Sequence, residues 1–85
     1  MSKNLFNKIN NILTRWNPLD VPHFIASDEY KDYVQGIVSQ GKDFNRIRSE
    51  LKRIIVDQMG LTFMDDIPEH SLDLDNVTKE IFEVL

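Results

Sequence analysis

The side chains best suited to holding a metal ion are two histidines and a run of acidic residues. His23 and His70 are far apart in the sequence, and a site would need both beside carboxylates such as Asp66 or Glu69. The acidic run from residue 65 to 75 lacks the spacing and the central glycine of an EF-hand calcium loop. We therefore expect exposed loop histidines and helix-capping carboxylates, with no metal site.

Hydroxyl and phosphate chemistry have equally little support. Cys is absent, and the three glycines are isolated, so the chain has no thiol nucleophile and no Gly-rich phosphate loop. The serines fall at predicted helix caps, near a helix end, or on a polar helix face, namely Ser27, Ser39, Ser49 and Ser71. We predict a protein that is not an enzyme, with no catalytic residues and no cofactor.

Length and composition indicate a soluble globular protein. The chain has 85 residues, a net charge of −4, 41% hydrophobic residues and 28% charged residues. We expect one helical domain spanning residues 1–85, small enough for its stability to be marginal and for a weak homodimer to form. No signal peptide and no apolar run of roughly 20 residues is present, so we expect a cytoplasmic location and no membrane contact.

Hydrophobic spacing predicts an all-α fold, a small bundle of about four helices. We expect helices over residues 3–16, 28–40, 44–59 and about 73–85, with irregular segments at 17–26 and 61–71. Ser27 and Asp43 are predicted N-caps, with Asp28 and Glu29 in the first turn after Ser27. The predicted buried faces, one per helix, are Leu5, Phe6, Ile9, Ile12, Leu13 and Trp16; Tyr30, Tyr33, Val34, Ile37 and Val38; Phe44, Ile47, Leu51, Ile54 and Ile55; and Leu74, Val77, Ile81, Phe82 and Leu85.

Glycines and charges add two expectations about packing. Gly36 weakens its helix, which indicates close approach of another helix, whereas Gly41 and Gly60 end helices. Basic residues concentrate at 42–53 and acidic residues at 65–83, so the two segments are expected to pair within the fold. The sequence leaves open whether the acidic segment docks on the third helix or binds a partner.

A nucleic-acid-binding protein is the alternative interpretation. Residues 30–55 have the outline of a helix-turn-helix, with four basic side chains on the second helix: Arg46, Arg48, Lys52 and Arg53. These side chains point to two sides of that helix, Glu50 and Asp57 interrupt one of them, and the net charge is negative. Nucleic acid is therefore the less favoured partner.

The favoured interpretation is a protein–protein interaction module. Trp16, Tyr30 and Tyr33 come from adjoining segments, and Trp and Tyr are enriched at binding hot spots. Three carboxylates, Asp28, Glu29 and Asp32, form an acidic ridge beside the tyrosines that suits a basic, as yet unidentified protein partner. The alternative is structural: Trp16 anchors the core and both tyrosines pack under the loop.

One motif also carries a family resemblance. The run Trp16-Asn17-Pro18-Leu19 with Val21, followed by Asp28-Glu29-Tyr30-x-x-Tyr33-Val34, resembles the YugE-like family of short bacterial proteins of unknown function. The likeness covers residues 5 to 61 and includes Met59-Gly60-Leu61. It implies a small all-helical fold and no catalytic residues. Similar segments in small proteins regarded as immunity partners of bacterial toxins imply an immunity- or adaptor-like role.

Overall fold

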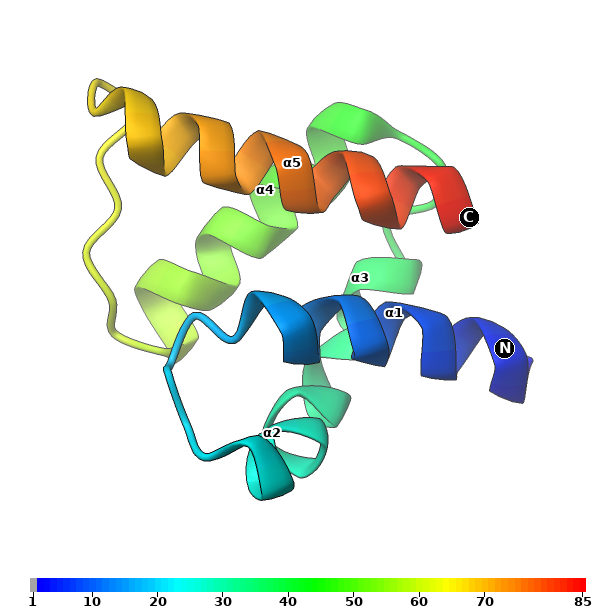
Figure 1. The fold of residues 1–85 in the computed structure, drawn as a ribbon. Helices are drawn as coiled ribbons and strands as arrows, with labels where there is room; N and C mark the ends of the chain where they lie inside the picture. The colour runs from blue at the N-terminus through cyan, green and yellow to red at the C-terminus, as the bar shows by residue number, and fades with distance from the viewer. Residues whose placement is uncertain (1) are drawn as a thin grey trace.

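The computed structural model describes residues 2–85, apart from the side chain of His23. This part of the chain is helical and has no strand, so the predicted all-α bundle is confirmed. Four helical stretches follow one another: α1 (Lys3–Trp16); α2 (His23–Tyr30) with η1 (Lys31–Tyr33) and α3 (Val34–Val38); α4 (Phe44–Arg53) with η2 (Ile54–Gln58); and α5 (Pro68–Val84). Helices α1 and α5 lie antiparallel, and α4 crosses behind them (Figure 1). Helix α2 packs on the side of α1 that faces away from α5.

Helix α1 follows the prediction at both ends. The Ser2 hydroxyl accepts a hydrogen bond from the Leu5 N–H at 3.1 Å, which caps the start. The helix ends at Asn17, whose φ of 48° is left-handed, immediately before Pro18. The centre of the predicted apolar face, Ile9, Ile12 and Leu13, is buried against α5 and α2.

The second helical stretch begins at His23, so the prediction of an N-cap at Ser27 is wrong. Ser27 lies inside α2, and Asp28 and Glu29 lie in its second half and not in its first turn. The reason is packing. Ala26 and Tyr30 are four residues apart and both fully buried, and this burial stabilises helix well before Ser27. The Asn10 side-chain amide of α1 also donates to the Ser27 carbonyl at 3.1 Å.

The third stretch keeps its predicted limits but changes its winding. The Asp43 carboxylate accepts from the Arg46 N–H at 3.1 Å, which confirms the cap. Helix α4 then widens into the π-helical turn η2, and the stretch stops before Gly60, at a φ of +69°. Gly41 also has a left-handed φ of +75°, as expected, but α3 ends at Val38, two residues before the predicted end of the second helix at residue 40.

Helix α5 begins five residues earlier than predicted, at Pro68 instead of Asp73. Proline bars the interior of a helix but suits its first position, where its missing N–H has no intrahelical partner to lose. His70 is therefore on a helix and not in a loop. The irregular connection shortens to residues 59–67, which pass from the end of η2 to the start of α5 (Figure 1).

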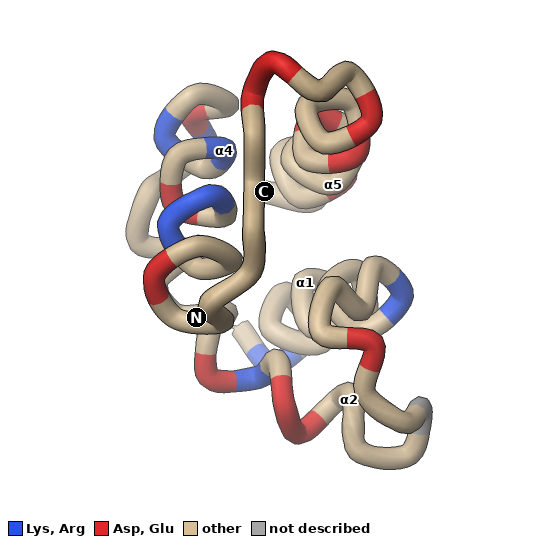
Figure 2. The backbone as a smooth tube through the Cα atoms, turned by 90° about the vertical axis from the view of Figure 1, so that its left-hand side faces the viewer, with Lys and Arg blue, Asp and Glu red and all other residues tan. Residues whose placement is uncertain are grey.

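The basic and acidic segments pair in part as expected, although Glu80 pairs with Arg15 of α1 and Arg53 pairs with Glu50 of its own helix. Arg48 on α4 binds the Asp75 carboxylate of α5 at 2.6 Å and Asp65 at 3.2 Å, and Lys52 binds Asp65 at 2.5 Å. Figure 2 shows the basic positions along α4 and the acidic ones along α5 and the connection before it. These contacts dock the acidic segment on the third helical stretch.

Gly36 on α3 lies against a side chain of α4. A Cβ at this position would lie 2.8 Å from Glu50 Oε2, so the predicted close approach of another helix is confirmed. Within the described residues, no helix is both long and apolar enough to cross a membrane.

Candidate interaction surfaces

The face of α2 that points to solvent carries two apolar and two acidic side chains. Phe24 is 84% exposed and Ile25 is 41% exposed, whereas Ala26 and Tyr30 on the opposite face are fully buried. Phe24 and Asp28 are four residues apart, as are Ile25 and Glu29, so each apolar side chain is next to a carboxylate. We call these four residues, Phe24, Ile25, Asp28 and Glu29, the α2 outer face.

Tyr30 is not a surface residue, so its prediction as a partner-binding side chain is wrong. The ring is fully buried, and the hydroxyl donates to Asn17 Oδ1 at 2.6 Å while accepting from the Leu19 N–H at 3.0 Å. Burial is the main cause that raises the pKa of the Tyr30 hydroxyl above its ordinary value, and the bond from Leu19 opposes this shift. The structural alternative, packing under the loop, is correct for this tyrosine.

The other predicted residues divide between two places. The carboxylates Asp28, Glu29 and Asp32 are exposed, and Asp28 is 3.5 Å from the Lys31 ammonium. Tyr33 is half-buried against the core. Trp16, by contrast, lies against α5, where its indole Nε1–H donates to Asp73 Oδ2 at 2.7 Å. The predicted aromatic surface of Trp16, Tyr30 and Tyr33 therefore does not form.

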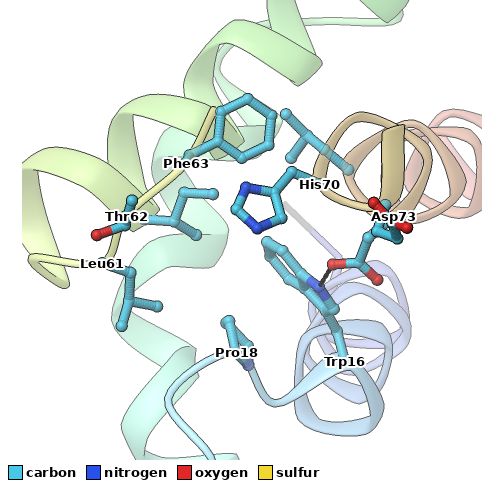
Figure 3. Close-up of a pocket in the computed structure, with 10 residues that line it drawn as sticks. Trp16, Pro18, Leu61, Thr62, Phe63, His70 and Asp73 are labelled. Atoms are coloured by element: carbon cyan, nitrogen blue, oxygen red, sulfur yellow. Dashed lines mark hydrogen bonds between the residues drawn. The ribbon is translucent and has the colours of Figure 1, made fainter. Parts of the chain in front are cut away.

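A pocket of about 460 Å³ opens beside Trp16, between the end of α1, the turn η2 and the start of α5 (Figure 3). Its size falls within the range of small-ligand sites. Aromatic, apolar and acidic side chains line it: Trp16, Pro18, Ile55, Leu61, Thr62, Phe63, Glu69, His70, Asp73 and Leu74.

Hydrogen bonds fix the orientation of the polar groups in this pocket. The His70 Nδ1 atom accepts from the Met64 N–H at 3.1 Å, which requires that nitrogen to be unprotonated and places the ring proton of neutral His70 on Nε2. The Phe63 and His70 rings are tilted by 34°, with centroids 5.9 Å apart. Asp73 receives the indole N–H on one oxygen, Oδ2.

Most of the basic side chains on the second helix of the predicted helix-turn-helix form ion pairs within the fold. Arg48 binds both Asp65 and Asp75, Lys52 binds Asp65, and Arg53 binds Glu50 at 2.7 Å. The hydrogen bond to Asp75 is the largest cause that raises the pKa of Arg48, and the bond from Lys52 is the largest that lowers the pKa of Asp65. Among the described residues, Arg46 is the one of the four predicted basic side chains without an ion pair.

Two sets of surface residues escaped the sequence analysis. The apolar pair Phe24-Ile25 was placed in an irregular segment, although Ala26 and Tyr30 at i and i+4 were a signal for helix there. The pocket combines three separate segments, and no spacing in the sequence indicates that they meet. Within residues 2–85, His23 excepted, no cluster of three His, Asp or Glu side chains could hold a metal ion.

Comparisons with protein-family models, curated proteins and solved structures found no match to this chain. The resemblance to the YugE-like family therefore stays a prediction from the sequence.

Proposed function

We propose that this chain is a non-enzymatic protein–protein interaction module of the cytoplasm, immunity- or adaptor-like, that binds a basic partner surface through the α2 outer face. The observation that carries the proposal is the exposure of Phe24, 84%, on a helix whose other face is locked into the core by Ala26 and Tyr30. Aromatic side chains, Phe included, are enriched at the centres of protein interfaces, so an exposed Phe on a helix packed against the core suits a binding surface.

The surroundings of Phe24 support a basic partner. Covering an exposed Phe side chain is worth about 1.5–3 kcal/mol, which is enough to anchor a contact but not to define its partner. Specificity then comes from Asp28, Glu29 and Asp32, which lie on or just after the same helix and are exposed. Carboxylates around an apolar centre speed association with a basic surface and disfavour an acidic one.

Single exposed apolar residues elsewhere do not form such a combination. Val56, Met64 and Leu72 are exposed on η2, the connection and α5, one on each element. Isolated surface hydrophobes of this kind are normal in soluble proteins. The pair on α2 stands out because two apolar side chains and two carboxylates share one helix face.

Self-association through α2 is a less favoured use of the same face. Two copies would bring Asp28 and Glu29 of one near the same carboxylates of the other, and like charges in an interface are unfavourable. The nucleic-acid alternative draws no support from the basic stretch, since Arg48, Lys52 and Arg53 are held by carboxylates of this chain.

The test is affinity capture from nuclease-treated lysate of the native cell with matched variants. The variants Phe24→Ser and Asp28→Asn/Glu29→Gln remove the apolar centre and the charge, respectively. Leu72→Ser and Asp66→Asn/Glu83→Gln make the same changes at exposed sites on or next to α5. A protein retained by the wild type and both controls, and lost with both α2 variants, supports the proposal. Retention by the α2 variants, or loss of every protein on nuclease treatment, contradicts it.

A further inference from the structure

The pocket beside Trp16 has a charge that its own lining does not neutralise. Glu69 and Asp73 contribute two carboxylates, and no lysine or arginine is among the residues that line it. One oxygen of Asp73 receives the indole N–H of Trp16, and its other oxygen has no hydrogen bond from a described residue. Glu69 likewise has no ion pair within the described part of the chain. The pocket is therefore lined by negatively charged hydrogen-bond acceptors and by no lysine or arginine that would balance them.

Its aromatic walls favour the same kind of ligand. The face of an indole attracts cations more strongly than that of any other aromatic side chain, and Trp16 lines this pocket together with Phe63. The molecule already uses one of these rings in this way: the Lys52 ammonium lies 5.4 Å from the centroid of Phe63. That ammonium is held by Asp65 at 2.5 Å, so its charge is balanced outside the pocket.

Buried residues and hydrogen bonds hold the walls of the pocket in place. Ile55, in the π-helical turn η2, and Leu74, on α5, are buried apolar residues at its base. Pro18 lines one side, and the Trp16–Asp73 hydrogen bond orients the indole (Figure 3). The hydrogen bond from the Met64 N–H orients the His70 ring. π-helical turns occur frequently at functional sites, because widening a helix redirects its side chains.

From this arrangement we infer that the pocket binds an organic cation that carries a guanidinium group, stacked on Trp16 and paired with Glu69 and Asp73. A planar guanidinium suits both partners, since it stacks on aromatic faces and donates several hydrogen bonds to carboxylates. The inference is independent of the role proposed for α2. The group could arrive on a free small molecule or on an arginine side chain of another protein, and these two sources are separable by experiment.

The single tryptophan makes the test direct, because all indole fluorescence comes from Trp16. The probes are methylguanidinium, an N-acetyl arginine amide, and the matching citrulline amide, which has nearly the same shape without the charge. A saturable change in Trp16 emission with a guanidinium probe and none with citrulline is the expected result. A response to both guanidinium probes shows that the guanidinium group alone is sufficient, as a free cation requires, whereas a response to the arginine amide alone shows that the site also needs the stem and amides of a chain-borne arginine.

Variants then locate the site. Glu69→Gln and Asp73→Asn should each weaken the affinity for the guanidinium probe about tenfold, the equivalent of roughly 1.4 kcal/mol. Asp73→Asn keeps an oxygen that can accept the indole N–H, and Glu83→Gln changes the same charge at the exposed far end of α5 and should leave the affinity unchanged. The inference is overturned by no saturable response, by an equal response to citrulline, or by equal affinity in the Glu69→Gln and Asp73→Asn variants and the wild type.

Discussion

The Tyr30 hydroxyl donates a hydrogen bond to Asn17 Oδ1 at 2.6 Å and so ties the second helical stretch to the end of the first. The same Asn17 side chain accepts from the Val21 N–H and donates to the Val21 carbonyl, and Leu19 N–H donates to the tyrosine oxygen. The Pro-containing connection is thereby held at its centre by two side chains. This junction positions α2 and, with it, the proposed binding face.

Removing the tyrosine hydroxyl should weaken the fold. Tyr30→Phe keeps the buried ring but leaves the Leu19 N–H and one lone pair of Asn17 without their partner, which we expect to cost about 1–2 kcal/mol of unfolding free energy. Chemical denaturation with equal slopes for both proteins measures this loss. Tyr33→Phe serves as the matched control at a half-buried tyrosine, and an equal loss there would contradict the role given to the junction.

Tyr30 should also make stability fall at alkaline pH. Its pKa is raised above the ordinary value of 10.0 because burial disfavours the charged phenolate. A raised folded-state pKa gives a contribution that is complete below pH 10.0 and declines as the pH rises through the folded-state value. The difference in unfolding free energy between wild type and Tyr30→Phe should therefore shrink above pH 10. A difference in unfolding free energy that stays constant from pH 8 to 11 would show that Tyr30 has the same pKa in the folded and unfolded states, and would contradict this prediction.

The Arg48 contacts should matter most among the basic residues. Arg48→Ala removes hydrogen bonds to Asp75, Asp65 and Ser71 that join α4 to α5 and its preceding connection, and should cost about 1–2 kcal/mol. Arg46→Ala on the same helix is the control and should change stability by less than about 0.5 kcal/mol. Thermal unfolding separates the two, since each 1 kcal/mol shifts the Tm of a domain this size by about 4–8 °C. Similar Tm values for both variants would refute the ranking.

The Asp65 carboxylate, which belongs to the same set of contacts, should make stability fall at acid pH. Its pKa lies below the ordinary 3.8 because Lys52 and then Arg48 bind the charged form. A lowered pKa gives a contribution that is complete above 3.8 and is lost as the pH falls through the folded-state value. Asp65→Asn should therefore flatten the dependence of stability on pH below 4. An unchanged slope would mean that the carboxylate titrates alike in both states.

Packing at Gly36 is best tested by a double-mutant cycle. Ala is the better helix former by about 0.5–1 kcal/mol, but its Cβ would displace the Glu50 carboxylate from 2.8 Å and disturb the Glu50–Arg53 pair. Gly36→Ala should thus stabilise the Glu50→Ala background by more than it stabilises the wild type. Equal effects in both backgrounds, measured by denaturant unfolding, would show that Glu50 does not restrict residue 36.

Elements with a strong apolar period were the ones that could be predicted from the sequence. The faces of α1 and α4, the Asp43 cap and the Gly60 stop all follow from local spacing and side-chain chemistry. The starts of α2 and α5 were missed because each depends on context. Burial of Ala26 stabilises helix before Ser27, and Pro68 opens α5 where a proline suggested a break.

Surface properties were less accessible than the core. A tyrosine at a helix edge fits a core and an interface equally well from sequence, and only its partners, Asn17 and Leu19, place Tyr30 inside. Phe24 shows the reverse case, because its exposure depends on how α2 is rotated about its axis. Trp16 lies with Asp73, 57 residues later, and so belongs to a pocket that no local pattern indicates.

The most direct test of the proposed function is the affinity of a captured partner for matched variants of the purified protein. Calorimetric titration of that partner should show binding weakened at least about tenfold by Phe24→Ser, equivalent to roughly 1.4 kcal/mol, and also weakened by Asp28→Asn/Glu29→Gln, with Leu72→Ser unchanged. Affinity that is equal for Phe24→Ser and Leu72→Ser would contradict the assignment of the α2 outer face as the binding surface.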